Sequence, residues 1–153
     1  MVKKDKSKDK KKEQATEAEE SESQPETAPK AGGGKKVLVV EDDAMLSSMY
    51  RMKLEDSGYT ALVANEGNQG LELAKKEKPD LILLDIMMPM MDGFAVLAEI
   101  KADASLKDAP VIIMTNLGTN EDIEKGKKMG AVDYVVKADH TPAQIVEKIK
   151  KYL

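Results

Sequence analysis

The sequence predicts a doubly wound α/β domain, in which helices cover both faces of a parallel β-sheet. Short apolar runs of four to six residues alternate with longer amphipathic stretches from residue 36 to the end of the chain. Each stretch between two runs is long enough for a helix, and strands joined by a helical crossover pair in parallel.

Five strands are predicted from the apolar runs, which are rich in valine, isoleucine and leucine. They are Val37–Val40, Tyr59–Ala64, Leu81–Leu84, Val111–Met114 and Val132–Val136. The first, third and fourth are apolar without alternation, which is typical of central strands that are covered on both faces.

Five helices are predicted from the amphipathic stretches. One begins near Ala44, and the others cover Asn68–Glu77, Gly93–Ala102, Asn120–Met129 and Pro142–Leu153. In the first helix we expect Leu46, Met49 and Leu54 on the buried face.

The last helix has the clearest local signals. Thr141 precedes Pro142 and lies three residues before Gln144, the pattern of a capping box with proline at the first helical position. Ile145, Ile149 and Leu153 follow at steps of four residues, so we expect one buried stripe that runs to the end of the chain.

Residues 1–35 are predicted to form a charged, low-complexity tail and linker, and 36–153 the folded domain. Residues 1–36 hold ten lysines and eight acidic residues, whereas the remaining 117 residues hold 14 basic and 20 acidic ones. The tail has too few apolar residues to bury a core. A basic arm for nucleic acid or membrane is the alternative, but the acidic block at Glu13–Glu26 would compete for its lysines, so we expect neither direct nucleic-acid contact nor membrane insertion.

The composition excludes several classes of protein. The chain has no cysteine, which excludes disulfides, thiolate metal sites and cysteine nucleophiles, and its single histidine, His140, excludes a multi-histidine metal site. No apolar run approaches the length of about 18 residues that spans a bilayer, and no apolar signal segment follows the first lysines. We expect a soluble, cytoplasmic protein.

Charged and reactive side chains follow four of the predicted strands. Glu41 and Asp42 follow the first strand, Asp85 the third, Thr115 the fourth and Lys137 the fifth. In such sheets ligands bind outside the carboxyl ends of the strands, so we expect these side chains to meet in one crevice.

The chemistry of these groups favours a magnesium-dependent phosphoryl acceptor. Three converging carboxylates repel one another unless a cation is bound, and oxygen ligands suit Mg²⁺. Asp85 can then act as a nucleophile that forms an aspartyl phosphate, while Lys137 and Thr115 contact phosphoryl oxygens. The neighbouring Asp43 is predicted only to cap the helix near Ala44.

Four sequence blocks resemble the receiver domain of two-component response regulators. They are VLVVEDD at 37–43, LILLDIMMPMMDG at 81–93, VIIMT at 111–115 and GAVDYVVK at 130–137. The resemblance covers about Lys36 to Leu153 and implies a flavodoxin-like (βα)5 fold with strand order 2-1-3-4-5.

The resemblance also implies roles for residues at the strand ends. Asp85 would accept a phosphoryl group from a phosphohistidine on a sensor histidine kinase or phosphotransfer protein. Asp42 would bind Mg²⁺ directly and Glu41 through water, and the backbone carbonyl of Met87 would complete the protein ligands. Lys137 would contact the phosphate.

The signalling response is implied in the same way. Thr115 and Tyr134 would be the switch residues, while Pro89 and Gly93 shape the loop after the phosphoacceptor. An unidentified output protein would bind the face of the fourth helix, fifth strand and fifth helix, around 123–128, Tyr134 and 142–151. Gly126 suits a helix that shifts between states.

From the resemblance we further expect a regulatory phosphoacceptor rather than an enzyme. We also expect a stand-alone receiver, since the chain ends directly after the last predicted helix. It should be a monomer or weak dimer.

Three positions depart from the usual pattern of the family. Ala138 stands where proline usually follows the lysine, which leaves the Lys137–Ala138 bond either trans or held cis at a cost. Asn116 is larger than the usual small residue after the threonine. The apolar Met87 cannot position an attacking water, so we expect a long-lived phosphoryl group.

The loop methionines Met87, Met88, Met90 and Met91 are expected to pack over the end of the sheet, and His140 is expected to be a solvated loop residue.

The sequence leaves other functions open. One is a receiver-like adaptor that is no longer phosphorylated, with Ala138 and Asn116 as signs that the sequence has drifted from the family pattern. A haloacid-dehalogenase-like phosphatase would need a second aspartate where Met87 stands. A dinucleotide oxidoreductase would need a glycine-rich turn after the first strand, and a phosphate loop at Gly32–Lys36 lacks the required spacing.

Overall fold

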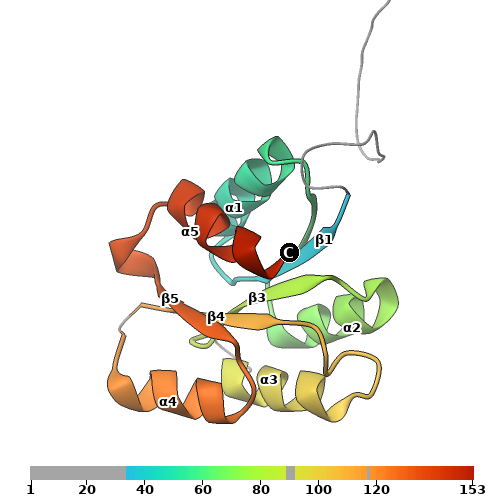
Figure 1. Cartoon of the computed structure of the whole chain (residues 1–153), viewed down its shortest axis with the longest axis vertical. Helices are drawn as coiled ribbons and strands as arrows, with labels where there is room; N and C mark the ends of the chain where they lie inside the picture. Colours follow the sequence, from blue (N-terminus) through green and yellow to red (C-terminus); the bar gives the residue numbers. More distant parts are fainter. Residues whose placement is uncertain (1–33, 89–91, 117) are drawn as a thin grey trace, which may run out of the picture.

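The computed structural model of the chain describes residues 34–88, 92–116 and 118–153. The predicted tail at 1–35 lies almost entirely outside these ranges, as do Pro89, Met90 and Met91. The described chain forms a parallel sheet with helices on both faces (Figure 1).

Strands and helices alternate strictly along the chain. Their bounds are β1 Lys36–Val40, α1 Ala44–Asp56, β2 Thr60–Ala64, α2 Gly67–Glu77, β3 Leu81–Asp85, α3 Gly93–Ala102, β4 Val111–Thr115, α4 Asn120–Lys128, β5 Asp133–Val136 and α5 Pro142–Ile149. Short 3₁₀ turns follow β5 and α5, at Lys137–Asp139 and Lys150–Tyr152. The predicted order of five strands and five helices is confirmed.

The strands pair in parallel in the order β2-β1-β3-β4-β5, as the resemblance implied. The chain turns to one side of β1 to form β2 and to the other side to form β3, β4 and β5. The strand order therefore reverses between β1 and β3, and the crevice at such a point is where ligands bind in doubly wound sheets.

Two buried clusters fill the space on the two faces of the sheet. Alternate residues of each strand point to opposite faces, so Val37 and Val39 lie under α1 and α5, whereas Leu38 and Val40 lie under α2 and α3. Figure 1 shows α1 and α5 on one side of the sheet and α2, α3 and α4 on the other. Each fully buried valine or leucine contributes about 1.5–3 kcal/mol of transfer free energy, which fixes the sheet between the helical layers.

Helix ends are capped as the sequence predicts. The side chain of Asp43 accepts hydrogen bonds from the backbone of Met45 and Leu46 at the start of α1. Thr141 and Gln144 form the complete capping box of α5. These bonds satisfy backbone donors that the first turn of a helix leaves unpaired.

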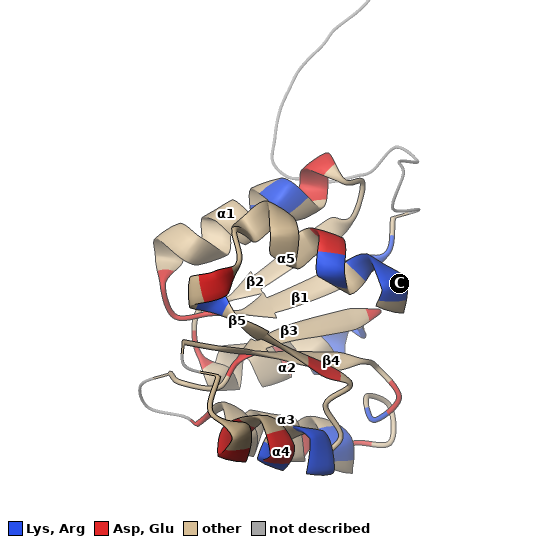
Figure 2. Cartoon of the chain, turned by 60° about the vertical axis from the view of Figure 1, so that its left-hand side comes forward, with Lys and Arg blue, Asp and Glu red and all other residues tan. Residues whose placement is uncertain are grey.

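The charges of α4 follow its dipole. Acidic residues lie in its first turn and lysines in its last, as Figure 2 shows. Negative charge near the amino end and positive charge near the carboxyl end both stabilise a helix, which offsets part of the low helix propensity of Gly126.

The predicted buried face of α1 is partly wrong. Met49 is 41% exposed, whereas Ser47, Tyr50 and Leu54 are buried. The burial follows a step of four residues from Leu46 through Tyr50 to Leu54, and Met49 lies about 100° away from Tyr50 on the helix.

Two further expectations need correction. The last α-helix ends at Ile149 and continues as a 3₁₀ turn, so Leu153 is only partly buried while Ile145 and Ile149 are fully buried. The side chain of Met87 is 55% exposed rather than packed over the sheet, although Met88 is buried.

His140 is partly buried, and its Nδ1 lies 3.0 Å from the carbonyl oxygen of Val136. It is therefore a structural contact of the turn after β5 rather than the solvated residue we expected.

Gly126 has a packing role that the sequence did not reveal. A Cβ at this position would lie 2.4 Å from Cδ1 of Ile113 in β4. The glycine therefore lets α4 approach the sheet closely, in addition to lowering the propensity of the helix.

Within the described ranges, no helix is long and apolar enough to cross a membrane.

Candidate functional site

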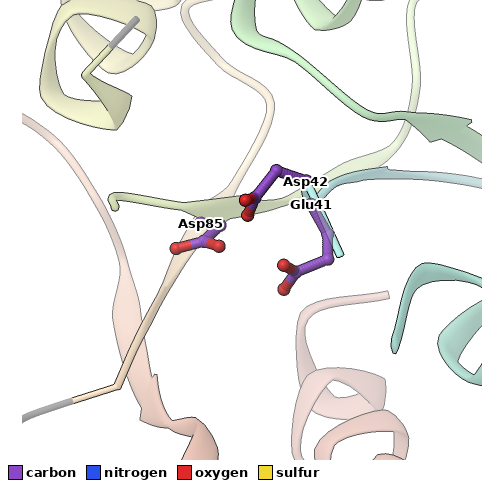
Figure 3. Close-up of side chains that lie close together, drawn as sticks. All are labelled: Glu41, Asp42 and Asp85. Atoms are coloured by element: carbon purple, nitrogen blue, oxygen red, sulfur yellow. The ribbon is translucent and has the colours of Figure 1, made fainter. Parts of the chain in front are cut away.

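Three carboxylates meet at the carboxyl ends of β1 and β3. Glu41 and Asp42 directly follow β1, and Asp85 is the last residue of β3. One oxygen from each lies within 4.8 Å of the others, and Figure 3 shows the three side chains gathered at this edge. The sequence predicted this meeting, because adjacent parallel strands end at the same edge of a sheet.

The three carboxylates differ sharply in their exposure. Glu41 and Asp85 are each 1% exposed, whereas Asp42 is exposed at the rim. By the two-residue period of a strand, Glu41 continues the sheet face of Val39, and Asp85 that of Leu83. Both buried carboxylates therefore lie on the face that α1 and α5 cover.

Lys137 joins the two buried carboxylates. Its Nζ donates to Oε1 of Glu41 at 2.9 Å and to Oδ2 of Asp85 at 3.0 Å, and the lysine side chain is 9% exposed. The 3₁₀ turn after β5 carries this lysine to the sheet edge. One ammonium thus faces three carboxylates, which leaves an excess of two negative charges when all three are ionised.

This crowding changes the proton affinities of Glu41 and Lys137. Burial raises the pKa of Glu41 to about 7, and the negative charge of Asp85 adds to this, against the hydrogen bond from Lys137. Burial lowers the pKa of Lys137, but its bonds and charge interactions with Glu41 and Asp85 outweigh burial and leave that pKa raised. The lysine therefore stays charged at neutral pH.

Backbone groups orient the two buried carboxylates. The backbone N–H of Met87 donates to Oδ1 of Asp85 at 2.9 Å, and that of Asp43 donates to Oε2 of Glu41 at 3.1 Å. Each oxygen of each carboxylate consequently has a fixed donor.

Gly93 is required by a close approach next to the site. A Cβ on Gly93 would lie 2.3 Å from Cα of Ile86 and 2.4 Å from the carbonyl oxygen of Asp85. Both contacts are with backbone, which cannot move aside as a side chain can. The glycine therefore lets α3 begin directly against the end of β3.

Two polar residues that were not predicted from the sequence support the site. Nδ2 of Asn65 donates to the carbonyl oxygen of Glu41 at 2.9 Å and to Oγ of the buried Ser47 at 3.2 Å. Asn65 directly follows β2, so the strand-end rule that selected the other residues also points to it.

The two residues expected to act as a switch lie on adjacent strands. Thr115 is the last residue of β4 and is 1% exposed. Tyr134 in β5 is partly buried, and the ammonium groups of Lys127 from α4 and Lys148 from α5 each lie 5.3 Å from its ring centre. Tyr134 thus contacts both helices of the expected output face.

The structure also describes two of the positions that depart from the usual family pattern, Ala138 and Asn116. No cis peptide bond occurs in the described part of the chain, so the Lys137–Ala138 bond is trans. Asn116 is exposed.

The donor set fits a hard divalent cation. All three side chains offer oxygen, two of the three are buried, and one lysine does not balance their charge. Cations such as Mg²⁺ and Mn²⁺ prefer carboxylate and carbonyl oxygens. The arrangement can hold such an ion beside a buried carboxylate and a lysine ammonium, which are the groups that phosphoryl transfer requires.

The chain matches known proteins over most of the described domain. A family model of the response regulator receiver domain matches residues 37–150. The probable transcriptional regulator ycf27 of Guillardia theta is 39% identical over 119 residues, which cover 78% of this chain and 45% of that protein. The chain spans less than half the length of the curated relatives that it matches first.

Solved structures agree with the sequence comparison. The chemotaxis protein CheY4 of Vibrio cholerae has a TM-score of 0.73 at 29% identity, with 78% of this chain and 98% of CheY4 covered. The Mn²⁺-bound form of the response regulator Rcp1 has a TM-score of 0.68 at 27% identity, with 76% and 92% covered. Receiver domains are phosphoacceptor modules of regulatory proteins rather than enzymes, and histidine kinases phosphorylate them. The chain belongs to the family of response regulator receiver domains.

Proposed function

We propose that this receiver domain is a magnesium-dependent switch that accepts a phosphoryl group on Asp85. The observation that carries the proposal is the position of Asp85, which is 1% exposed beside two carboxylates and within 3.0 Å of the Lys137 ammonium. Burying a carboxylate beside two others is costly unless cations balance the negative charge.

The residues that would hold Mg²⁺ are Glu41, Asp42, Asp85 and the backbone carbonyl of Met87. When bound, the ion would neutralise negative charge on the transferred phosphoryl group. The Mn²⁺-bound form of Rcp1 supports a divalent metal at a receiver domain of this fold.

The acceptor step uses the carboxylate oxygen of Asp85 as the nucleophile. A bond forms between that oxygen and phosphorus, and the bond from phosphorus to the donor atom breaks. The donor atom is the nitrogen of a phosphohistidine or the acyl oxygen of acetyl phosphate. Lys137 pairs with the oxygens of the phosphoryl group, and the buried hydroxyl of Thr115 donates to another. The donor protein is a sensor histidine kinase or a phosphotransfer protein.

The response to the phosphoryl group passes from Thr115 to Tyr134. Tyr134 contacts Lys127 of α4 and Lys148 of α5 through its ring, so a change in its position alters both helices. We infer that an unidentified output protein binds the face formed by α4, β5 and α5. A cytoplasmic location agrees with this role.

The exposed side chain of Met87 supports slow loss of the phosphoryl group. A thioether accepts hydrogen bonds only weakly and cannot hold a water in line with the phosphorus. The phosphoryl group on Asp85 is accordingly expected to be long-lived.

Intact mass spectrometry after incubation with acetyl phosphate tests the function. The protein should gain one phosphoryl group with Mg²⁺ and none with a chelator, and Asp85→Asn should gain none under either condition. Asp80→Asn is the matched control and should label like the wild type. Asp80 directly precedes β3, at the other end of the strand from Asp85, and accepts a hydrogen bond from the backbone N–H of Lys36. Failure of the wild type to label overturns the proposal and favours a non-phosphorylated adaptor.

A further inference from the structure

Tyr50 is a buried polar residue that the proposed reaction does not use. Its side chain lies on α1 and is 1% exposed. Among residues 34–88, 92–116 and 118–153, its hydroxyl has no hydrogen-bond partner, whereas buried hydroxyls in folded proteins nearly always have one.

The fold places Tyr50 on the same face of the sheet as the buried carboxylates. Tyr50 packs in one cluster with Val39 and Leu83, the strand residues whose face Glu41 and Asp85 continue. Ser47, one turn earlier on α1, connects through Asn65 to the backbone carbonyl of Glu41. This side of α1 therefore lies against the residues that form the acidic site.

The electrostatic surroundings of Tyr50 agree with this placement. Burial raises the pKa of the Tyr50 hydroxyl to about 12, and the negative charge of Glu41 is the next largest cause, ahead of the opposing charge of Lys137. A phenol hydroxyl that keeps its proton can donate a hydrogen bond.

The carboxylate of Glu41 has room for another donor. Its Oε1 accepts from Lys137 and its Oε2 accepts from the backbone of Asp43. Each carboxylate oxygen has about two acceptor sites, so one more hydrogen bond on either oxygen displaces neither existing partner.

We propose that Tyr50 is a positioning residue of the acidic site, whose hydroxyl donates to the carboxylate of Glu41 through one ordered water. The Lys137 ammonium is shared between Glu41 and Asp85, so it cannot serve Glu41 fully while it serves a phosphoryl group on Asp85. The donor from Tyr50 keeps Glu41 oriented when the lysine bond weakens. This inference rests on the proposed role of Glu41 in binding Mg²⁺.

The first test measures Mg²⁺ affinity by isothermal titration calorimetry. Tyr50→Phe keeps the ring and removes only the hydroxyl, and we expect its affinity to fall about tenfold, as for other residues that orient metal ligands. Tyr59→Phe is the matched control, since Tyr59 is 9% exposed in the same cluster but lies beside the opposite end of the sheet, directly before β2. Its affinity should be unchanged, and an unchanged affinity of Tyr50→Phe overturns the proposal.

The second test uses the metal-free protein and separates positioning from simple packing. The unfolding equilibrium constants of Tyr50→Phe, Glu41→Ala and the double variant form a double-mutant cycle. A water-mediated hydrogen bond between the two residues predicts that the effect of Tyr50→Phe is about tenfold smaller without Glu41. Equal effects in both backgrounds overturn the inference. Because no metal is added, this result stands apart from the proposed function, which fails instead if the wild type binds no Mg²⁺.

Discussion

The ammonium of Lys137 lies 3.0 Å from Oδ2 of Asp85, although 52 residues separate them along the chain. The same ammonium lies 2.9 Å from Oε1 of Glu41. One cation therefore serves two buried carboxylates that the ends of β1 and β3 bring together. The stability and the chemistry of the site both depend on this shared contact.

Replacing Lys137 and replacing Asp85 should have different effects on stability. Lys137→Met leaves two buried carboxylates without a cation, so we expect the free energy of unfolding of the metal-free protein to fall by about 3 kcal/mol at pH 8. Asp85→Asn removes one negative charge and leaves the pair of Lys137 and Glu41, so stability should stay within about 1 kcal/mol of the wild type or rise. Urea denaturation with a chelator measures both values. A larger loss in Asp85→Asn than in Lys137→Met contradicts the charge balance described here.

The raised pKa of Glu41 gives stability a distinct pH dependence. The folded protein holds this proton up to about pH 7, whereas the unfolded chain releases it near its ordinary value of 4.5. The folded state binds more protons in this window, so stability contributed by Glu41 is lost as the pH rises from about 4.5 to about 7. The loss is at most about 3 kcal/mol. The raised pKa of Lys137 acts outside this window, because its contribution is lost only above its ordinary value of 10.5.

Urea denaturation at several pH values, without metal, measures this slope. Glu41→Gln cannot titrate and serves as the control, so its stability should fall less than that of the wild type across the window. Equal slopes in the two proteins are the result that contradicts the assignment.

Alanine should have unequal effects at two glycines. In Gly93→Ala the new methyl group meets backbone atoms of Ile86 and Asp85, so we expect a loss of at least about 2 kcal/mol and a displaced α3. In Gly126→Ala the one contact that is too close is with the end of the Ile113 side chain, and a gain in helix propensity of about 1 kcal/mol offsets this contact. Thermal unfolding compares the two variants. If Gly126→Ala loses as much stability as Gly93→Ala, the difference between side-chain and backbone contacts does not decide the effect.

Two adjacent aspartates should separate metal binding from folding. Asp42 is exposed in the acidic site, so Asp42→Asn should weaken Mg²⁺ binding at least tenfold while it changes stability by less than about 0.5 kcal/mol. Asp43 caps α1, so Asp43→Ala should cost about 1 kcal/mol of stability and leave Mg²⁺ binding within about threefold. Calorimetric titration and thermal unfolding of both variants measure the two properties. The reverse pattern would show that the roles are exchanged.

The strand ends made most of the site predictable from the sequence. Glu41, Asp42, Asp85 and Lys137 each lie where a short apolar run stops, and parallel strands bring such positions to one edge of the sheet. The fold class followed from the same alternation of runs, because helical crossovers require parallel pairing.

The supporting residues were harder to predict because their roles depend on packing between elements. The apolar pattern of α1 predicted Met49 on the buried face, and only the contact with the sheet shows that Tyr50 takes that place. In the same way, the need for glycine at position 93 comes from the backbone of Ile86, which no local pattern specifies. The exposure of Met87 likewise depends on the path of the chain after β3.

The carboxylate that becomes phosphorylated can be identified chemically. Borohydride reduces an aspartyl phosphate to homoserine, and tandem mass spectrometry of peptides then locates the reduced residue. After incubation with acetyl phosphate and Mg²⁺, we predict homoserine at position 85 alone, and none when a chelator replaces the metal. Reduction at another carboxylate, or an unchanged Asp85 in protein that has gained a phosphoryl group, would show that Asp85 is not the phosphoacceptor.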